Sequence, residues 1–253
     1  MPTKTKQPRL FSLRPEQRRR CIDQLLDVSL LTPDYLLTLG LSVTIVAIGL
    51  LMDSASVIIG GMVVAPLLSP IMTLAMGIVL ADFRLLSNAL RTLAFSLLIV
   101  FGLSVLLALF YPSPGLNGEI LERSRASLAH FIIAVAAGVL AAFAFTRPEK
   151  STRLTGIAVS VALLPPVVTS ALGIALADWS LMTNAFAIFI LNLMGIVFSA
   201  IIIFSLMGFY NSRRDAEKIL EKEEKEAEQE WEGLKPENGP KEKGKEKGKA
   251  KGS

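Results

Sequence analysis

The sequence predicts an all-α integral membrane protein. Six transmembrane helices are expected to form two inverted three-helix repeats, with the second and fifth helices broken at prolines. Three observations support this. The 253-residue chain is 52% hydrophobic with a mean hydropathy of +0.53, which is too apolar for an ordinary soluble domain. No lysine occurs between Lys6 and Lys150, so positive charge is largely kept out of the apolar region. Finally, an ungapped repeat aligns the two halves of that region.

Six apolar segments are long enough to cross the hydrocarbon core of a bilayer, which takes roughly 20 residues in a helix. They cover residues 34–52, 55–80, 84–110, 127–146, 152–177 and 180–209. Thr32 is placed to cap the first of these helices, and Pro33 suits its first turn. The fourth segment is rich in alanine and glycine, which indicates either close packing near the repeat axis or a subunit interface in a homo-oligomer.

The two ends of the chain differ from the membrane domain. Residues 1–33 form an N-terminal segment whose amphipathic helix, predicted over 15–31, is expected to lie at the membrane surface. The membrane domain covers 34–209, with repeat 1 at 34–110 and repeat 2 at 127–209. Residues 210–253 are predicted to begin as a charged helix and to end in a disordered tail rich in Lys, Gly and Glu.

Orientation follows from the placement of Lys and Arg, which favour cytoplasmic loops. With the N-terminus inside, 24 of the 26 basic residues are cytoplasmic, and only Arg123 and Arg125 lie outside. The chain is therefore predicted to cross the plasma (inner) membrane several times with both termini in the cytoplasm. The net charge of +4 reflects this topology, so the lipid bilayer is an expected partner and nucleic acid is not.

The repeat is carried by AMGIVLADFRLLSNA at 75–89 and ALGIALADWSLMTNA at 171–185, which are identical at 9 of 15 positions. The same offset of 96 residues places LLSPIMT (67–73) on LLPPVVT (163–169). Each unit holds three spans, so the second enters the membrane from the opposite face, as in many transporters. Asp82 and Asp178 open the third and sixth spans and are expected to cap them.

The prolines of spans 2 and 5 indicate a candidate site. Pro66, Ser69 and Pro70 interrupt one span, and Pro165 and Pro166 interrupt the other. Each proline removes a helix hydrogen bond. The carbonyls left without helical partners, which could coordinate a solute, are those of Met62, Pro66, Val161 and Ala162. Paired breaks in inverted halves predict a binding site near the midplane. The competing interpretation is a pair of structural kinks satisfied by neighbouring hydroxyls and helices.

The predicted pathway combines these residues with polar side chains in the same repeats. Its members are Pro66, Ser69, Pro70, Thr73, Asn88, Pro165, Pro166, Thr169 and Asn184. Arg91 has two interpretations: it reaches the cytoplasmic headgroups, or it acts as a gate or anion contact.

The motifs that carry these features resemble a known family. The stretches LLTPDYLL, LLMDSASVIIGGMVVAPLLSPIM, ADFRLLSNALR and GIAVSVALLPPVVTSALGIAL are similar to the hydrophobic membrane family catalogued as domain of unknown function 389. The resemblance covers about residues 25–209. It implies the membrane topology and supplies no substrate.

The function expected from the sequence is a membrane transporter or channel for a small solute or ion, with its pathway between the repeats. The alternative is a membrane scaffold or signalling subunit that acts through its cytoplasmic ends. An enzyme is not expected, because the chain has one histidine and no Asp or Glu deep within a span. No metal site or cofactor is expected either.

Overall fold

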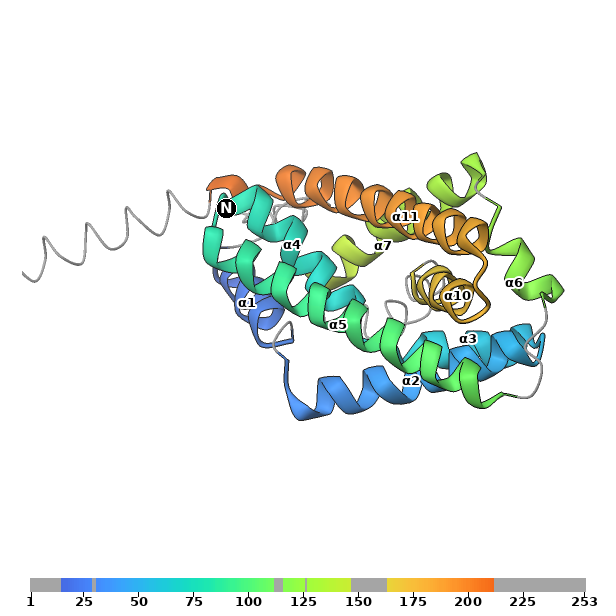
Figure 1. The fold of residues 1–253 in the computed structure, drawn as a ribbon. Coiled ribbons are helices and arrows are strands. Elements are labelled where there is room, and N and C mark those ends of the chain that lie inside the picture. The colour runs from blue at the N-terminus through green and yellow to red at the C-terminus, as the bar shows by residue number, and fades with distance from the viewer. Residues whose placement is uncertain (1–14, 29–30, 112–115, 126, 147–162, 212–253) are drawn as a thin grey trace, which may run out of the picture. The chain divides into compact units, whose positions relative to one another are not determined.

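The computed structural model describes residues 15–28, 31–111, 116–125, 127–146 and 163–211, and the regular structure in these segments is helical (Figure 1). The helices are α1 (Pro15–Val28), α2 (Pro33–Leu51), α3 (Ala55–Val64), α4 (Leu68–Leu80), α5 (Phe83–Phe110), α6 (Gly118–Glu122), α7 (Leu128–Thr146), α10 (Leu164–Ala175) and α11 (Trp179–Leu206), followed by the short 3₁₀ helix η1 (Phe209–Asn211).

Four of these helices, α2, α5, α7 and α11, are long and apolar enough to cross a membrane. The pair α3 and α4 makes a fifth candidate if the two are counted together. This agrees with the prediction of an all-helical membrane protein. The predicted fifth span is described only from residue 163, where the short apolar helix α10 follows, so its first half lies outside the described residues.

Side-chain caps fix the starts of three helices where the sequence places them. The hydroxyl of Thr32 accepts a hydrogen bond from the Tyr35 N–H at 3.2 Å, and Pro33 occupies the first turn of α2. Asp82 accepts from the second N–H of α5 at 2.8 Å. Asp178 accepts from the third N–H of α11 at 2.9 Å. All three predicted caps are confirmed.

The turns α4–α5 and α10–α11 share a tight geometry. Ala81 and Ala177 have φ values of 50° and 55°, in the left-handed region that alanine rarely adopts. Glycines at 77 and 173 allow the next helix to approach closely. A Cβ on Gly173 would lie 2.6 Å from the Met182 nitrogen, so a larger residue there would push α11 away.

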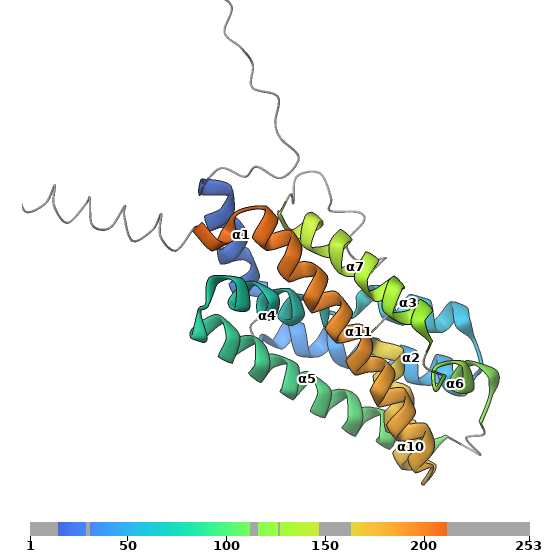
Figure 2. The same cartoon turned by 90° about the horizontal axis from the view of Figure 1, so that it is seen from above.

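The helices α4 and α10 form the centre of the packing. Each of them packs against both α5 and α11, which run in opposite directions (Figures 1 and 2). α4 lies toward the start of α5, and α10 lies toward the start of α11. The side chains at 69–73 and 163–173 are buried. These two short helices therefore hold the most buried stretches that the sequence links to function.

The small residues of α7 pack against α11. A Cβ on Gly138 would lie 2.7 Å from the backbone of Ile196, and a Cβ on Gly195 would lie 3.0 Å from the Ala134 side chain. The fourth predicted span thus uses its small residues for close helix packing within the chain.

The amphipathic segment near the N-terminus is helical over Pro15–Val28, within the predicted 15–31. Cys21 and Leu25 are 3% and 0% exposed, because α1 packs against α4 and α7. Leu30, which the sequence places on the same face, lies outside the described residues.

Candidate functional site

The break that the sequence predicts in span 2 corresponds to residues 65–67, where α3 and α4 meet at a bend of 52°. Pro66 lies in this break, and Pro70 lies in the first turn of α4, where its missing N–H costs no helix bond. The Met62 carbonyl accepts from the Ala65 N–H at 3.2 Å, and the Pro66 carbonyl accepts from the Ser69 N–H at 3.3 Å. Local bonds therefore satisfy both carbonyls, which the sequence suggested as solute ligands.

The corresponding prolines of the second predicted repeat lie at the start of α10. Pro165 and Pro166 lie in its first turn and are buried. Proline has no N–H, so these residues reduce the number of unpaired donors at a buried helix start. The residues that would precede a break here, 147–162, lie outside the described part of the chain.

The hydroxyls predicted on α4 are buried, and the one on Thr73 is engaged. Ser69 is 8% exposed and Thr73 is 0% exposed. The Thr73 hydroxyl lies 2.9 Å from the Leu25 carbonyl of α1 and 3.0 Å from the Ser69 carbonyl of its own helix. Leu25 is one of the last four residues of α1, whose carbonyls have no partner within the helix. Thr73 therefore ties the end of α1 to α4.

Thr169 occupies the matching position on α10, 96 residues later, but its hydroxyl is not engaged. Its side chain is 0% exposed, and its oxygen has no hydrogen-bond partner among the described residues. The same is true of the buried hydroxyl of Ser104 on α5, a helix against which α10 packs. A buried hydroxyl without a partner costs about 1–3 kcal/mol, so each calls for a partner in the working protein.

The other predicted residues lie apart from these hydroxyls. Asn88 is half-buried on α5, whereas Asn184 is exposed on α11 with its Nδ2 3.4 Å from the Ser180 hydroxyl. Arg91 is exposed on α5. Six of the nine predicted residues are thus buried prolines and hydroxyls on α4 and α10. Pro66 is half-buried in the α3–α4 break, and the two amides are more exposed and lie near the starts of α5 and α11.

Sequence reasoning missed several buried polar contacts between helices. The Tyr35 hydroxyl lies 2.7 Å from the Ser96 hydroxyl, which joins α2 to α5. The Ser42 hydroxyl donates to the Gly61 carbonyl at 2.6 Å and joins α2 to α3. Ser104 was missed as well. A lone serine in an apolar run gives no signal by itself, because its partner comes from a distant segment.

The α2–α3 turn is tied to α6 by two contacts. The Asp53 carboxylate accepts from the Glu119 N–H at 2.8 Å, and the Asn117 side chain donates to the Leu50 carbonyl at 2.6 Å. Asn117 also caps α6 by accepting from the Ile120 N–H. The sequence did not indicate the two contacts between the turn and α6, since the residues that make them lie more than 60 positions apart.

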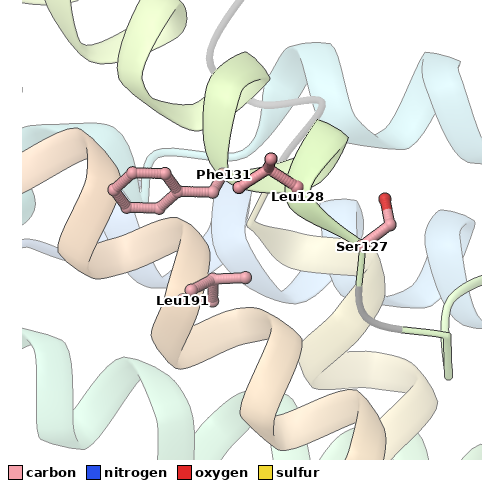
Figure 3. A pocket seen from close by; sticks show the side chains of 4 residues that line it. All are labelled: Ser127, Leu128, Phe131 and Leu191. Atoms are coloured by element: carbon pink, nitrogen blue, oxygen red, sulfur yellow. The ribbon is translucent and has the colours of Figure 1, made fainter.

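Two open pockets lie near the start of α7. One, of about 390 Å³, is lined by Ser127, Leu128, Phe131 and Leu191, and it lies between α7 and α11 (Figure 3). The other, of about 470 Å³, is lined by Gly118, Leu121, Glu122, Arg125, Ser127 and His130. Neither includes a predicted site residue. Within the described segments, no three His, Cys, Asp or Glu side chains gather as a metal site would require.

Comparison with known proteins identifies a matching family model and a similar protein. A family model described as "Domain of unknown function (DUF389)" matches residues 62–198. The uncharacterized protein MJ0678 of Methanocaldococcus jannaschii is 31% identical over 182 residues. That alignment covers 72% of this chain and 57% of the relative's length. No solved structure matches the chain.

Proposed function

The chain belongs to the family described as domain of unknown function 389, and we propose that it is a membrane transporter or channel for a small solute or ion. The observation that carries the proposal is the fully buried hydroxyl of Thr169 on the central helix α10, which has no hydrogen-bond partner among the described residues. A polar group kept in such a place at a cost to stability is typical of a functional site. A passing solute, with its water, would satisfy it.

The pathway would run between two inverted repeats. Supporting this, α5 and α11 each have 28 residues and begin and end 96 residues apart, and α4 and α10 begin at the same offset. The turns before α5 and α11 repeat the left-handed alanine and the capping aspartate. The short helix of each unit also packs against the long helix of the other unit, because α4 and α10 each contact both α5 and α11. On this basis we assign six spans, with spans 2 and 5 broken at Pro66 and at Pro165–Pro166.

Hydroxyls are the proposed solute contacts, rather than the carbonyls at the α3–α4 break, which are already bonded. Ser69, Thr73 and Thr169 are buried on the two short helices, and Ser104 adds a fourth hydroxyl on α5. A hydroxyl both donates and accepts, so it suits a weakly held ion or a small neutral solute. The asparagines and Arg91, which are more exposed, would lie nearer the entrances.

The bias in Lys and Arg supports the membrane assignment. Of the 26 basic residues, 24 fall on the side that carries both termini in the six-span topology. We therefore assign both ends to the cytoplasm and the protein to the plasma membrane. Loops after the first, third and fifth spans would face outward.

The test is solute entry into vesicles that contain the purified full chain. Three probes cover the solute classes: iodide with an entrapped halide-quenched dye, thallium with a thallium-sensitive dye, and glycerol by osmotic swelling. We expect one probe to enter faster than in protein-free vesicles. Ser69→Leu should abolish that entry, and Thr169→Val should slow it by about tenfold, as expected for one lost hydrogen bond.

The matched control is Thr44→Val. The Thr44 hydroxyl donates to the Gly40 carbonyl of its own helix at 2.8 Å, so its loss should leave entry unchanged. Entry no faster than in empty vesicles for all three probes would refute the transport proposal. So would full activity in a folded Ser69→Leu protein. Deleting residues 211–253 addresses the scaffold alternative, since a transporter should keep its flux without them.

A further inference from the structure

We propose that α1 is a gate that closes the cytoplasmic side of the pathway by occupying the Thr73 hydroxyl. This inference rests on the proposed function, because a gate requires a pathway. It assigns to the N-terminal helix a role in controlling solute access. It also accounts for the difference between two threonines in matching positions, of which Thr73 is bonded to α1 and Thr169 has no partner among the described residues.

The contacts of α1 place its buried face on α4 and α7. The Thr73 hydroxyl donates to the Leu25 carbonyl at 2.9 Å, and the Cys21 thiol donates to the Phe145 carbonyl at 3.4 Å. Leu25 and Phe145 both lie in the last turn of their helices, where carbonyls lack partners within the helix. Each bond therefore satisfies a helix end. Leu25 is 0% exposed and Cys21 is 3% exposed.

A further contact lies at the end of α11. A Cβ on Gly208 would lie 2.8 Å from Nη2 of Arg18, so the guanidinium rests against the backbone just after that helix. A positive charge is favourable at a helix C-terminus. The helix α1 thus touches α4, α7 and the end of α11, which are elements of both proposed repeats.

The comparison of Thr73 with Thr169 supports a role for α1 as a gate rather than as a fixed structural contact. Both are fully buried and both lie on a short central helix, 96 residues apart. Thr73 is occupied by α1, while Thr169 has no partner among the described residues. If solute contacts both hydroxyls as it passes, α1 must release Thr73 first. In the docked arrangement α1 competes with the solute for that hydroxyl.

The helix also has a second favourable location, which makes its release feasible. Its outer face carries exposed polar and charged side chains: Arg19, Arg20, Asp23 and Gln24. An amphipathic helix with arginines can lie in the headgroup layer, with its apolar face in the acyl boundary. One of the bonds that hold α1 in place, from the Cys21 thiol to the Phe145 carbonyl, is weak because a thiol is a weak donor. Release of α1 would therefore exchange burial of its apolar face in protein for burial in the membrane interface.

The experiment uses Leu25→Glu to release α1 and Gln24→Glu as its matched control. Both add one carboxylate to neighbouring positions, but only residue 25 is buried, where an unpaired charge is strongly disfavoured. A membrane-impermeant maleimide is applied to the cytoplasmic face of inside-out vesicles that hold the full chain. Labelling of Cys21, the only native cysteine, reports whether α1 is docked. Labelling of a cysteine at position 69, in Cys21→Ser, Ser69→Cys protein, reports whether the pathway is open.

We expect Leu25→Glu to speed labelling at both positions by at least about tenfold, and Gln24→Glu to change neither. Thr73→Val is a milder second variant that keeps the side-chain shape. It should speed labelling of Cys21 by about fivefold, and Thr73→Ser should restore protection. Cys21 exposed while position 69 stays protected would overturn the gate, as would protection of Cys21 in a folded Leu25→Glu protein.

Solute entry in the same vesicles separates this inference from the proposed function. Entry that is fast in wild type and unaffected by Leu25→Glu would refute the gate and leave transport standing. No entry of any probe, together with labelling of position 69 on release of α1, would refute transport while showing that α1 controls water access.

Discussion

Replacing each of the two matching threonines by valine should change stability in opposite directions. Thr73→Val removes the donor that binds the Leu25 carbonyl at 2.9 Å and leaves that buried carbonyl without this partner. Thr169→Val removes a buried hydroxyl that has no partner among the described residues, and the valine methyl fills nearly the same space. Thr73→Val should therefore destabilise the protein, and Thr169→Val should stabilise it.

The magnitudes follow from the cost of unpaired polar groups. A lost hydrogen bond that leaves a buried acceptor unsatisfied costs about 1–3 kcal/mol, so Thr73→Val should lower the free energy of unfolding by that amount. Removing an unpaired buried hydroxyl should recover up to about 1–3 kcal/mol. At about 2–4 °C per kcal/mol for a chain of this size, the two variants should differ in Tm by several degrees.

The assay is thermal unfolding of the purified full chain in one detergent, followed by circular dichroism. Thr73→Ser and Thr169→Ser retain the hydroxyl and lose one buried methyl each, so both should lower the Tm by a similar small amount, about 1 kcal/mol in stability. Shifts of Thr73→Val and Thr169→Val in the same direction would refute the reasoning, because it depends on one hydroxyl being bonded and the other not. If Thr169→Val is more stable but admits solute more slowly, the wild-type hydroxyl lowers stability and supports transport.

Three further predictions concern packing, the buried thiol and α6. Gly138→Ala should lower the free energy of unfolding by about 1–3 kcal/mol, seen as a lower Tm, because its Cβ would lie 2.7 Å from the α11 backbone. Gly102→Ala should leave the Tm nearly unchanged, because a Cβ there would have nothing within 4 Å. Burial raises the pKa of Cys21 from an ordinary 9.0 to about 12, so at pH 8 its thiolate should be about a thousandfold scarcer and maleimide labelling correspondingly slow. Asp53→Ala removes the acceptor for the Glu119 N–H, so the amides of α6 should exchange about tenfold faster with deuterium.

The sign of the pH effect on α1 follows from the same shift. The raised pKa means that docked Cys21 stays protonated above pH 9, while an undocked thiol loses its proton. Docking is therefore fully stable below pH 9 and weakens by about 1.4 kcal/mol per pH unit between 9 and 12. Labelling of Cys21 should rise with pH more steeply than labelling of an exposed thiol in that range. A parallel rise would contradict the buried position of Cys21.

The candidate site shows how far sequence reasoning reached. Sequence analysis selected the prolines of α4 and α10 because proline has the same effect on any helix, and the structure places Pro70, Pro165 and Pro166 in first turns. The partners of polar groups were not found. The Met62 and Pro66 carbonyls are bonded by N–H groups three residues ahead, a result of how the chain turns at the break. The Asp53 contact with α6 joins positions 66 residues apart.

The sequence by itself determined where the four long apolar helices lie and how three of them begin. Apolar length sets the long helices, and short-range chemistry sets the caps at Thr32, Asp82 and Asp178, since each cap binds N–H groups within three residues. Only the tertiary structure decided which hydroxyls are occupied. Thr73 and Thr169 lie in nearly the same local sequence, but Thr73 meets α1, 48 residues away, and Thr169 meets no such partner in the described chain. Local sequence specifies which groups need a partner, whereas packing between distant segments specifies which groups obtain one.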